Sequence, residues 1–316
     1  AAMMLVDEGR LDLDAAVVDY LPWWGRGDPA KSSVTVRHLL LHRAGLPPFR
    51  RFYLEMEGRE AYERAIGDLA LDYAPGTRTV YSDIGVMTVA FIVEELSGQH
   101  LDEFLEDRMW EPLGMSDTGF RPAVNLRPRI APTEVDSVFR GFHVHGDVHD
   151  ENAYAIGGVA GHAGLFSTAA DLSVAAQMLL NGGRISGCGP TAPVASSDRE
   201  DPTLSDGTIC ARAASGDIRI ISEATVHAFT QRYDASASRG LGWDTPSGRS
   251  SAGHYFTADA FGHTGYTGTS IWIDTELDLF VVLLTNRVNP TRENAKHVPL
   301  RRAVHDAAAL AITDQD

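Results

Sequence analysis

Two short strings of this sequence carry side chains that could take part in catalysis or in binding a substrate. They are Tyr-Ser-Asp at residues 81–83 and His-Thr-Gly at residues 263–265. The phenol of Tyr81 can transfer a proton, although a lone tyrosine is more often a packing residue. An ionised Asp83 only accepts hydrogen bonds, and it could equally be the N-cap of a helix that follows it. The imidazole of His263, with a reference pKa of about 6.5, is mostly neutral at pH 7.

A third string, residues 143–150, raises the possibility of a metal site. It contains His143, His145 and His149 and resembles the His-x-His-x-Asp-His zinc signature of metallo-hydrolases, except for one extra residue before the last histidine. That residue turns the last histidine away from the others, whereas zinc needs convergent ligands. We therefore predict no metal or other cofactor and keep a zinc hydrolase as the weaker alternative. His162 is interpreted as a loop residue near a cleft.

The sequence contains neither of two common serine-nucleophile motifs. Its two lysines are Lys31 and Lys296, and the residues three positions earlier are Asp28 and Glu293, so there is no Ser-x-x-Lys. There is no Gly-x-Ser-x-Gly elbow either.

The elements that must position these strings are mainly helical up to residue 221. The apolar residues of 84–96 cover nearly every face and predict a buried helix that ends at Gly98. Residues 184–220 are rich in Gly, Pro, Ser and Asp without any period, and we predict an exposed, partly disordered insertion there. Further helices are predicted over 36–41 with Thr35 as N-cap, over 101–110 and over 169–180.

Strand patterns appear only in the last part of the chain. A helix capped by Ser222 is followed by strands at 269–273 and 279–285, which predict an antiparallel hairpin. The continuous apolar run in the second strand predicts burial on both faces, with a covering helix over 293–312. We divide one catalytic domain into a mainly helical part, residues 1–221, and a sheet-and-helix part, residues 222–316.

The beginning of the chain reads as the end of a longer helix. Residues 1–8 are good helix formers closed by Gly9, but no capping residue precedes them. We interpret the chain as an N-terminally truncated fragment, so a signal peptide or anchor upstream of it would not be visible.

Composition excludes several classes of function. The net charge of -16 and the lack of a Lys/Arg-rich run argue against a nucleic-acid partner. No apolar stretch approaches the roughly 20 residues of a membrane-spanning helix. Cys188 and Cys210 are the only cysteines, and whether they form a bridge stays open.

Taken together, the strings resemble the β-lactamase and penicillin-binding superfamily, in particular its class C-like branch. In that family a Ser-x-x-Lys helix, a Tyr-x-Asn loop and a Lys-Thr-Gly strand converge on one cleft. Their order and spacing match here, and the resemblance also includes residues 38–47, 148–153 and 157–167. It implies an α+β fold: an antiparallel sheet flanked by helices plus a mainly helical region, with the first strands missing.

The resemblance assigns a role to each candidate residue. Tyr81 is similar to the tyrosine that deprotonates the nucleophilic serine, and Asp83 stands where the family has asparagine. His263 replaces the lysine that binds a substrate carboxylate, and the backbone of Thr264, Gly265 and Tyr266 forms the edge strand of the cleft. The backbone N–H of Tyr266 corresponds to one oxyanion donor, and the missing serine supplies the other.

The implied reaction is hydrolysis of an amide or ester through an acyl-enzyme. Small β-lactams or esters and peptidoglycan-type D-Ala peptides are the candidate substrates, with weak β-lactamase activity at most. The serine and lysine of the family would lie two to three turns upstream of Ala1, so we predict that this chain alone is inactive. A non-catalytic binding module is the alternative. An extracytoplasmic location follows from the family alone.

Overall fold

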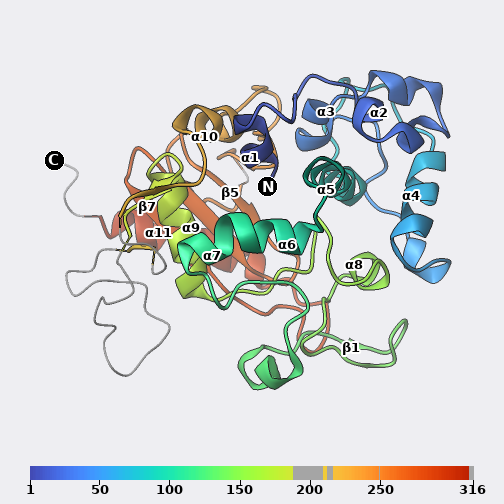
Figure 1. The fold of residues 1–316 in the computed structure, drawn as a ribbon. Helices are drawn as coiled ribbons and strands as arrows, with labels where there is room; N and C mark the ends of the chain where they lie inside the picture. Colours follow the sequence, from blue (N-terminus) through green and yellow to red (C-terminus); the bar gives the residue numbers. More distant parts are fainter. Residues whose placement is uncertain (188–208, 212–215, 249, 313–316) are drawn as a thin grey trace. The chain divides into compact units, whose positions relative to one another are not determined.

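The computed structural model describes residues 1–187, 209–211, 216–248 and 250–312, and its contacts divide the chain into two compact units (Figure 1). Each unit is described by itself. Our division of one catalytic domain at residue 221 stays a prediction. Unit 1 consists of Ala1–Leu105, Gly119–Pro132 and Asp136–Phe166, and unit 2 of Glu106–Thr118, Thr133–Val135 and Ser167–Asp316.

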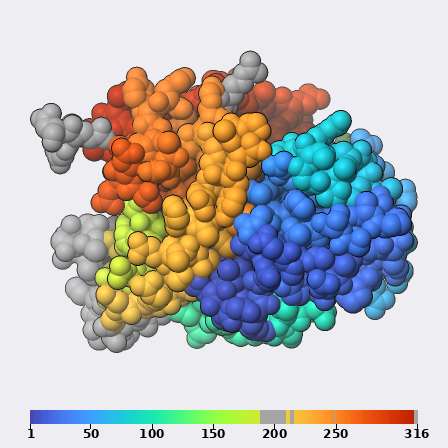
Figure 2. Space-filling view, turned by 90° about the horizontal axis from the view of Figure 1, so that it is seen from above, coloured from blue at the N-terminus to red at the C-terminus, as the bar shows by residue number. Residues whose placement is uncertain are grey.

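Unit 1 is built mainly from helices, and Figure 2 shows in dark blue the part of the beginning of the chain that reaches the surface, while Met3, Met4 and Leu5 are buried. The first helix ends before Gly9, which has the left-handed φ of +67° predicted for a helix stop. Its helices are α1 (Ala2–Asp7), α2 (Val17–Tyr20), α3 (Val36–Leu40), α4 (Arg59–Asp68), α5 (Asp83–Ser97), α6 (Leu101–Leu105) and α8 (Glu151–Ala155). They are connected by four 3₁₀ turns and one short strand: η1 (Pro22–Gly25), η2 (Pro29–Ser33), η3 (Phe52–Leu54), η5 (Val124–Arg129) and β2 (Phe142–His143). The strand β1 (Val135–Asp136) spans the unit boundary.

The predicted buried helix is α5, and its boundaries follow from its sequence. Gly98 closes it in the left-handed conformation, and most of its residues from Ile84 to Val93 are buried. The predicted cap was wrong by one residue. The N-cap is Ser82, whose hydroxyl accepts the N–H of Gly85, while Asp83 is the first helical residue.

The helix predicted over residues 101–110 is not a single α-helix. After α6 the chain widens into the π-helical turn η4 (Glu106–Trp110) and then forms α7 (Glu111–Leu113). Pro112 explains the change, because a proline has no N–H to donate and its ring clashes with the carbonyl four residues earlier.

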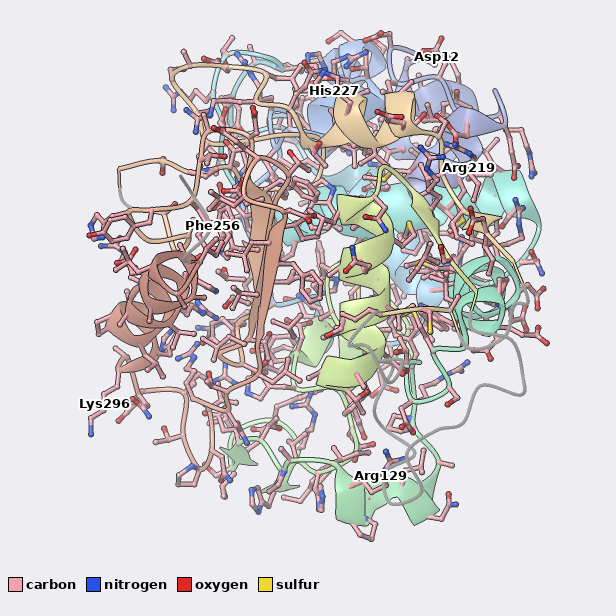
Figure 3. The ribbon with its side chains drawn as sticks, turned by 90° about the vertical axis from the view of Figure 1, so that its left-hand side faces the viewer. Asp12, Arg129, Arg219, His227, Phe256 and Lys296 are labelled. Atoms are coloured by element: carbon pink, nitrogen blue, oxygen red, sulfur yellow. The ribbon has the colours of Figure 1, made fainter. Side chains whose placement is uncertain are left out.

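Unit 2 contains a three-stranded antiparallel sheet with helices on both faces. The strands β5 (Phe261–Thr264), β6 (Ser270–Asp274) and β7 (Leu279–Leu283) lie in that order, so the predicted hairpin is confirmed. Figure 3 shows the sheet between the helices α9 (Ala169–Leu180) and α11 (His297–Leu310), which both contact β7. The prediction that this strand is buried on both faces was wrong. The residues of β7 are half-buried, because β7 is the last strand in the order of the described sheet.

The remaining elements of unit 2 frame the segment predicted to be irregular. The strands β3 (Arg184–Ile185) and β4 (Ile218–Arg219) pair antiparallel at its two ends, and α10 (Glu223–Thr230) begins after the predicted cap Ser222. Most of residues 184–220 lie outside the described residues. Cys210 is disulfide-bonded, and Cys188 lies outside them as well. Within the described ranges, no helix is long and apolar enough to cross a membrane.

Candidate active site

Residues 81–83, here called the tyrosine motif, are fixed in unit 1 where the chain enters α5. The backbone N–H of Ser82 donates to His42 Nδ1 at 3.3 Å, and the Ser82 hydroxyl donates to the carbonyl of Pro47 at 2.7 Å. The ring of Tyr81 packs on the ring of His42, with 4.4 Å between centroids, and 39% of Tyr81 stays exposed. The motif is therefore anchored through its middle residue, while its phenol reaches solvent.

His42 is a positioning residue that the sequence reasoning did not identify. It is buried and has a φ of +56°, a value uncommon outside glycine. Its Nδ1 accepts a hydrogen bond from Ser82, so this nitrogen carries no proton. The available signal was its place in the string 38–47, which carried the family resemblance without a role for this histidine.

Asp83 has a different environment from the exposed Tyr81. Burial raises the pKa of its carboxyl group, the negative charge of Asp150 raises it further, and the charge of His162 lowers it. The carboxyl group therefore binds a proton more readily than an ordinary aspartate. In its protonated form it can donate a hydrogen bond, as an asparagine amide does.

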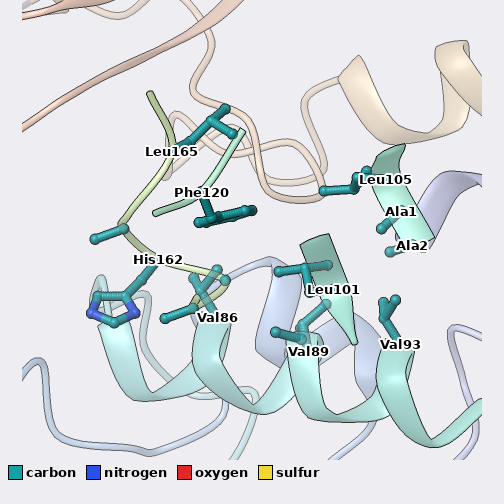
Figure 4. A pocket seen from close by; sticks show the side chains of 14 residues that line it. Ala1, Ala2, Val86, Val89, Val93, Leu101, Leu105, Phe120, His162 and Leu165 are labelled. Atoms are coloured by element: carbon teal, nitrogen blue, oxygen red, sulfur yellow. The ribbon is translucent and has the colours of Figure 1, made fainter. Parts of the chain in front are cut away.

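A pocket of about 330 Å³ lies in unit 1 along α5 (Figure 4). The beginning of α1, the helix α6 and the loop 160–165 also contribute to its wall. All of the side chains that line it are apolar except that of His162. The pocket thus offers a mainly apolar surface into which the lining contributes one imidazole.

Residues 263–266, here called the histidine motif, lie in unit 2 at the end of β5. His263 and Thr264 belong to the strand, paired with β6, but Tyr266 lies in the turn after it and is 58% exposed. The prediction that the edge strand continues to Tyr266 was therefore wrong. The N–H of Gly265 closes the turn by donating a hydrogen bond to the carbonyl of Thr269 at 2.8 Å. A Cβ at Gly265 would lie 2.2 Å from the Thr269 hydroxyl. A larger side chain at Gly265 would therefore require the Thr269 hydroxyl to move.

The hydrogen bonds of His263 identify its tautomer. Nδ1 lies 3.0 Å from the carbonyl oxygen of Thr264, and Nε2 lies 3.4 Å from Nη1 of Arg239. A carbonyl only accepts and a guanidinium only donates, so Nδ1 carries the proton and the ring is neutral. Burial, and then the charge of Arg239, lower the pKa of His263. The permanent cation at this position is thus Arg239, which the sequence reasoning did not identify.

Two further arginines hold the turn of the histidine motif by its backbone. Arg301, on α11, donates to the carbonyls of Gly265 at 2.6 Å and Thr269 at 2.7 Å. Arg287 donates to the carbonyl of Tyr266 at 2.7 Å, and its guanidinium stacks 4.1 Å from the ring centroid. Nothing in the spacing of these arginines indicated the contacts.

The predicted site residues therefore fall into two groups, each ordered within its own unit. Tyr81 and Asp83 are neighbours in unit 1, and the histidine motif is a single turn in unit 2. The histidines of the weaker zinc alternative do not form a cluster: among the described residues, no three His, Cys, Asp or Glu side chains are placed to hold a metal ion. Nε2 of His145 instead contacts the carbonyls of Arg127 and Ile130, both at 2.8 Å.

Comparison with known proteins identifies the family. The model of the beta-lactamase family matches residues 1–306, so the chain belongs to this family. A relative from Salmonella schwarzengrund, with the provisional name D-alanyl-D-alanine carboxypeptidase, is 30% identical over 95% of this chain and 68% of its own length. One of the same name from Escherichia coli K12 is 30% identical over 91% of this chain and 65% of its own length.

Solved structures show the same fold at lower sequence identity. A class C beta-lactamase aligns with a TM-score of 0.68 at 16% identity, over 100% of this chain and 79% of the other. A penicillin-binding protein homologue from Caulobacter crescentus aligns with a TM-score of 0.65 at 20% identity, over 96% and 79%. A family VIII carboxylesterase gives 0.65 at 20% identity, over 96% and 78%. The predicted fold and family are thus confirmed, and the family supports a hydrolase.

Proposed function

We propose that this chain is the larger part of a serine hydrolase that cleaves an amide or ester through an acyl-enzyme. The observation that carries the proposal is the anchored tyrosine motif in a chain of the beta-lactamase family. His42 and Pro47 hold Ser82, and the neighbouring Tyr81 is partly exposed to solvent. A phenol in this position can act as the general base that activates a serine and later a water molecule.

We further propose that the nucleophile belongs to a Ser-x-x-Lys that lies outside these 316 residues. The sequence contains no such motif, since Asp28 and Glu293 stand three positions before its lysines. In this proposal the N–H of Tyr266 is one oxyanion donor and the N–H of the serine is the other.

The preferred substrate is a peptide with a terminal carboxylate, such as a D-Ala peptide. The names of the relatives support this class, and so does Arg239, a permanent cation beside the neutral ring of His263. Small neutral esters are the second class, since one neighbour in structure is a carboxylesterase and His263 itself supplies no charge.

The decisive experiment compares this chain with the same chain extended by its native upstream sequence. Fluorescent penicillin and a fluorophosphonate should label the extended protein and leave the 316-residue chain unlabelled. Tyr81→Phe in the extended protein should slow acylation about 10²–10⁴-fold, because a positioned base contributes that much. Specific labelling of the 316-residue chain would refute the proposal that the nucleophile lies outside it.

A non-catalytic binding module is the second candidate, because the sequence contains no Ser-x-x-Lys. Saturable, reversible binding of a D-Ala peptide by the extended protein, without covalent labelling or turnover, would favour it.

A further inference from the structure

The buried side chain of His162 and the half-buried side chain of Asp150 form a hydrogen-bonded pair in unit 1, close to the beginning of α5. Nε2 of His162 lies 2.9 Å from Oδ1 of Asp150, and the His162 side chain is 2% exposed. Because a carboxylate oxygen only accepts, Nε2 carries the proton of this hydrogen bond. The same oxygen caps α8 by accepting the N–H of Ala153 at 2.7 Å. The helix therefore fixes Asp150, and Asp150 fixes the imidazole.

The second ring nitrogen of His162 has no such contact. Nδ1 is buried and has no hydrogen-bond partner among the described residues. Buried polar atoms are nearly always satisfied, so an orphaned nitrogen in an otherwise ordered pair requires an explanation.

The loop that carries His162 packs directly on α5. A Cβ at Gly161 would lie 2.5 Å from the carbonyl oxygen of Val86 and 2.9 Å from the Cβ of Ala90, so only glycine allows this approach. Figure 4 shows the imidazole beside the N-terminal end of α5, and Asp83 is the first residue of that helix. The charge of His162 lowers the pKa of the Asp83 carboxyl group, so the two side chains lie near each other.

We propose that Asp150 and His162 are a positioning pair for Asp83. Asp150 holds the imidazole through its hydrogen bond with Nε2, and Nδ1 exchanges a proton with the carboxyl group of Asp83. This inference rests on the proposed function where it places Asp83 at the substrate. One proton is exchanged: it leaves the Asp83 carboxyl oxygen and binds Nδ1, so that a neutral acid and a neutral imidazole become a carboxylate and an imidazolium. The reverse step restores both groups.

This exchange explains how an aspartate can stand where the family pattern has asparagine. The protonated carboxyl group of Asp83 donates a hydrogen bond to a substrate carbonyl, and the ionised form accepts one from a substrate N–H. Burial of Asp83 favours the protonated form, and a cationic His162 favours the ionised form. The pair therefore sets which of the two hydrogen bonds Asp83 makes.

The other titratable and charged groups around the pair have separate roles. Burial alone would raise the pKa of Asp150, but the hydrogen bond and charge of His162 lower it, and the N–H of Ala153 and the charge of His149 lower it further. Tyr62 donates to Asn152 at 3.0 Å, and burial raises its pKa, so it keeps its proton. Arg140 donates to three backbone carbonyls of the loop that carries Asp150, each at 3.1 Å. Within the described part of the chain, none of these groups is a hydrogen-bond partner of Nδ1.

The test uses the 316-residue chain labelled with ¹⁵N-histidine, because the two ring nitrogens of His162 should respond to different carboxylates. Asp83→Asn should shift the Nδ1 resonance of His162 and leave Nε2 nearly unchanged. Asp150→Asn should shift Nε2, and α8 keeps its cap because asparagine is also a good N-cap. The exposed His143 supplies the control: His143→Gln should change neither resonance.

A second measurement follows the carboxyl carbon of Asp83 by ¹³C NMR. His162→Gln should raise the pKa of Asp83 above its value in the unmodified chain, because it removes the charge that lowers it. The proposal would be overturned if Asp83→Asn left the chemical shift of Nδ1 unchanged. It would also be overturned if His162→Gln left the pKa of Asp83 unchanged. Neither readout needs turnover, whereas failure of the extended protein to acylate would refute the proposed function alone.

Discussion

The tyrosine motif of unit 1 and the histidine motif of unit 2 are held in place by different chemistry. Around the tyrosine motif the contacts are made by neutral or titratable groups, such as His42 and the carbonyl of Pro47. Around the histidine motif they are made by guanidinium groups, with Arg301 and Arg287 on backbone carbonyls and Arg239 on His263.

This difference corresponds to what each motif has to do in the proposed reaction. Moving a proton needs groups that can bind and release one, and the phenol of Tyr81 and the carboxyl group of Asp83 are groups of this kind. Binding an anion and holding a rigid turn need charges that do not titrate, which is what arginine provides. Four predictions test the contrast, from the largest expected effect to the smallest.

The largest effect is expected from the buried Arg301. Arg301→Met should lower the free energy of unfolding by about 3–5 kcal/mol, because the carbonyls of the histidine turn lose a charged donor that water cannot replace. Urea denaturation measures it. The neighbouring Arg302 is the matched control, since it donates to the carbonyl of Ser250, and Arg302→Met should cost about 1 kcal/mol. Equal losses would mean that the turn does not depend on Arg301.

His42 should have a smaller effect on unit 1. His42→Leu should lower the free energy of unfolding by about 1–3 kcal/mol, because the buried N–H of Ser82 loses its acceptor. His42→Asn should cost less, since asparagine tolerates the positive φ and keeps an acceptor. Urea denaturation ranks the two variants, and the opposite ranking would refute the role given to Nδ1.

Arg239 is expected to change selectivity more than stability. In the extended protein, Arg239→Gln should lower kcat/KM for a carboxylate-bearing D-Ala peptide about tenfold relative to a neutral ester, which corresponds to about 1.4 kcal/mol. The control is Arg232→Gln, since Arg232 donates to the Thr245 hydroxyl instead. If the ratio of the two substrates is unchanged in both variants, Arg239 does not face the substrate carboxylate.

The smallest effect concerns pH. Burial lowers the pKa of His263, His297 and His305 in unit 2 and of His38 in unit 1. Below pH 6.5 the unfolded chain binds protons that these folded histidines do not bind, so the stability present at pH 7 is lost as the pH falls. Each unit of pKa difference is worth about 1.4 kcal/mol.

Amide hydrogen exchange at pH 7.5 and 5.5 tests this prediction, and unit 2 should lose more protection than unit 1. His263→Asn should reduce the loss, and His143→Asn, at an exposed position, should leave it unchanged. A uniform loss over both units would contradict the assignment.

The sequence by itself determined the elements whose signals are local. Thr35 and Ser222 were identified as caps, and each hydroxyl accepts the N–H three residues later. Gly98 was identified as the end of the buried helix, and it has the left-handed conformation of a C-cap. Such signals need only neighbouring residues, so they are readable without a fold. The order and spacing of the two motifs likewise indicated the family, which the comparisons confirm.

Only the tertiary structure decided which side chains support the motifs. Arg239 lies 24 residues from His263, Arg301 lies 36 residues from Gly265, and the intervening chain gives no periodic signal for either contact. The sequence showed a neutral histidine where a cation was expected, but it could not show that a guanidinium lies beside it. A contact between distant residues exists only when the elements between them have folded, and its geometry is then set by the packing of a whole strand or helix.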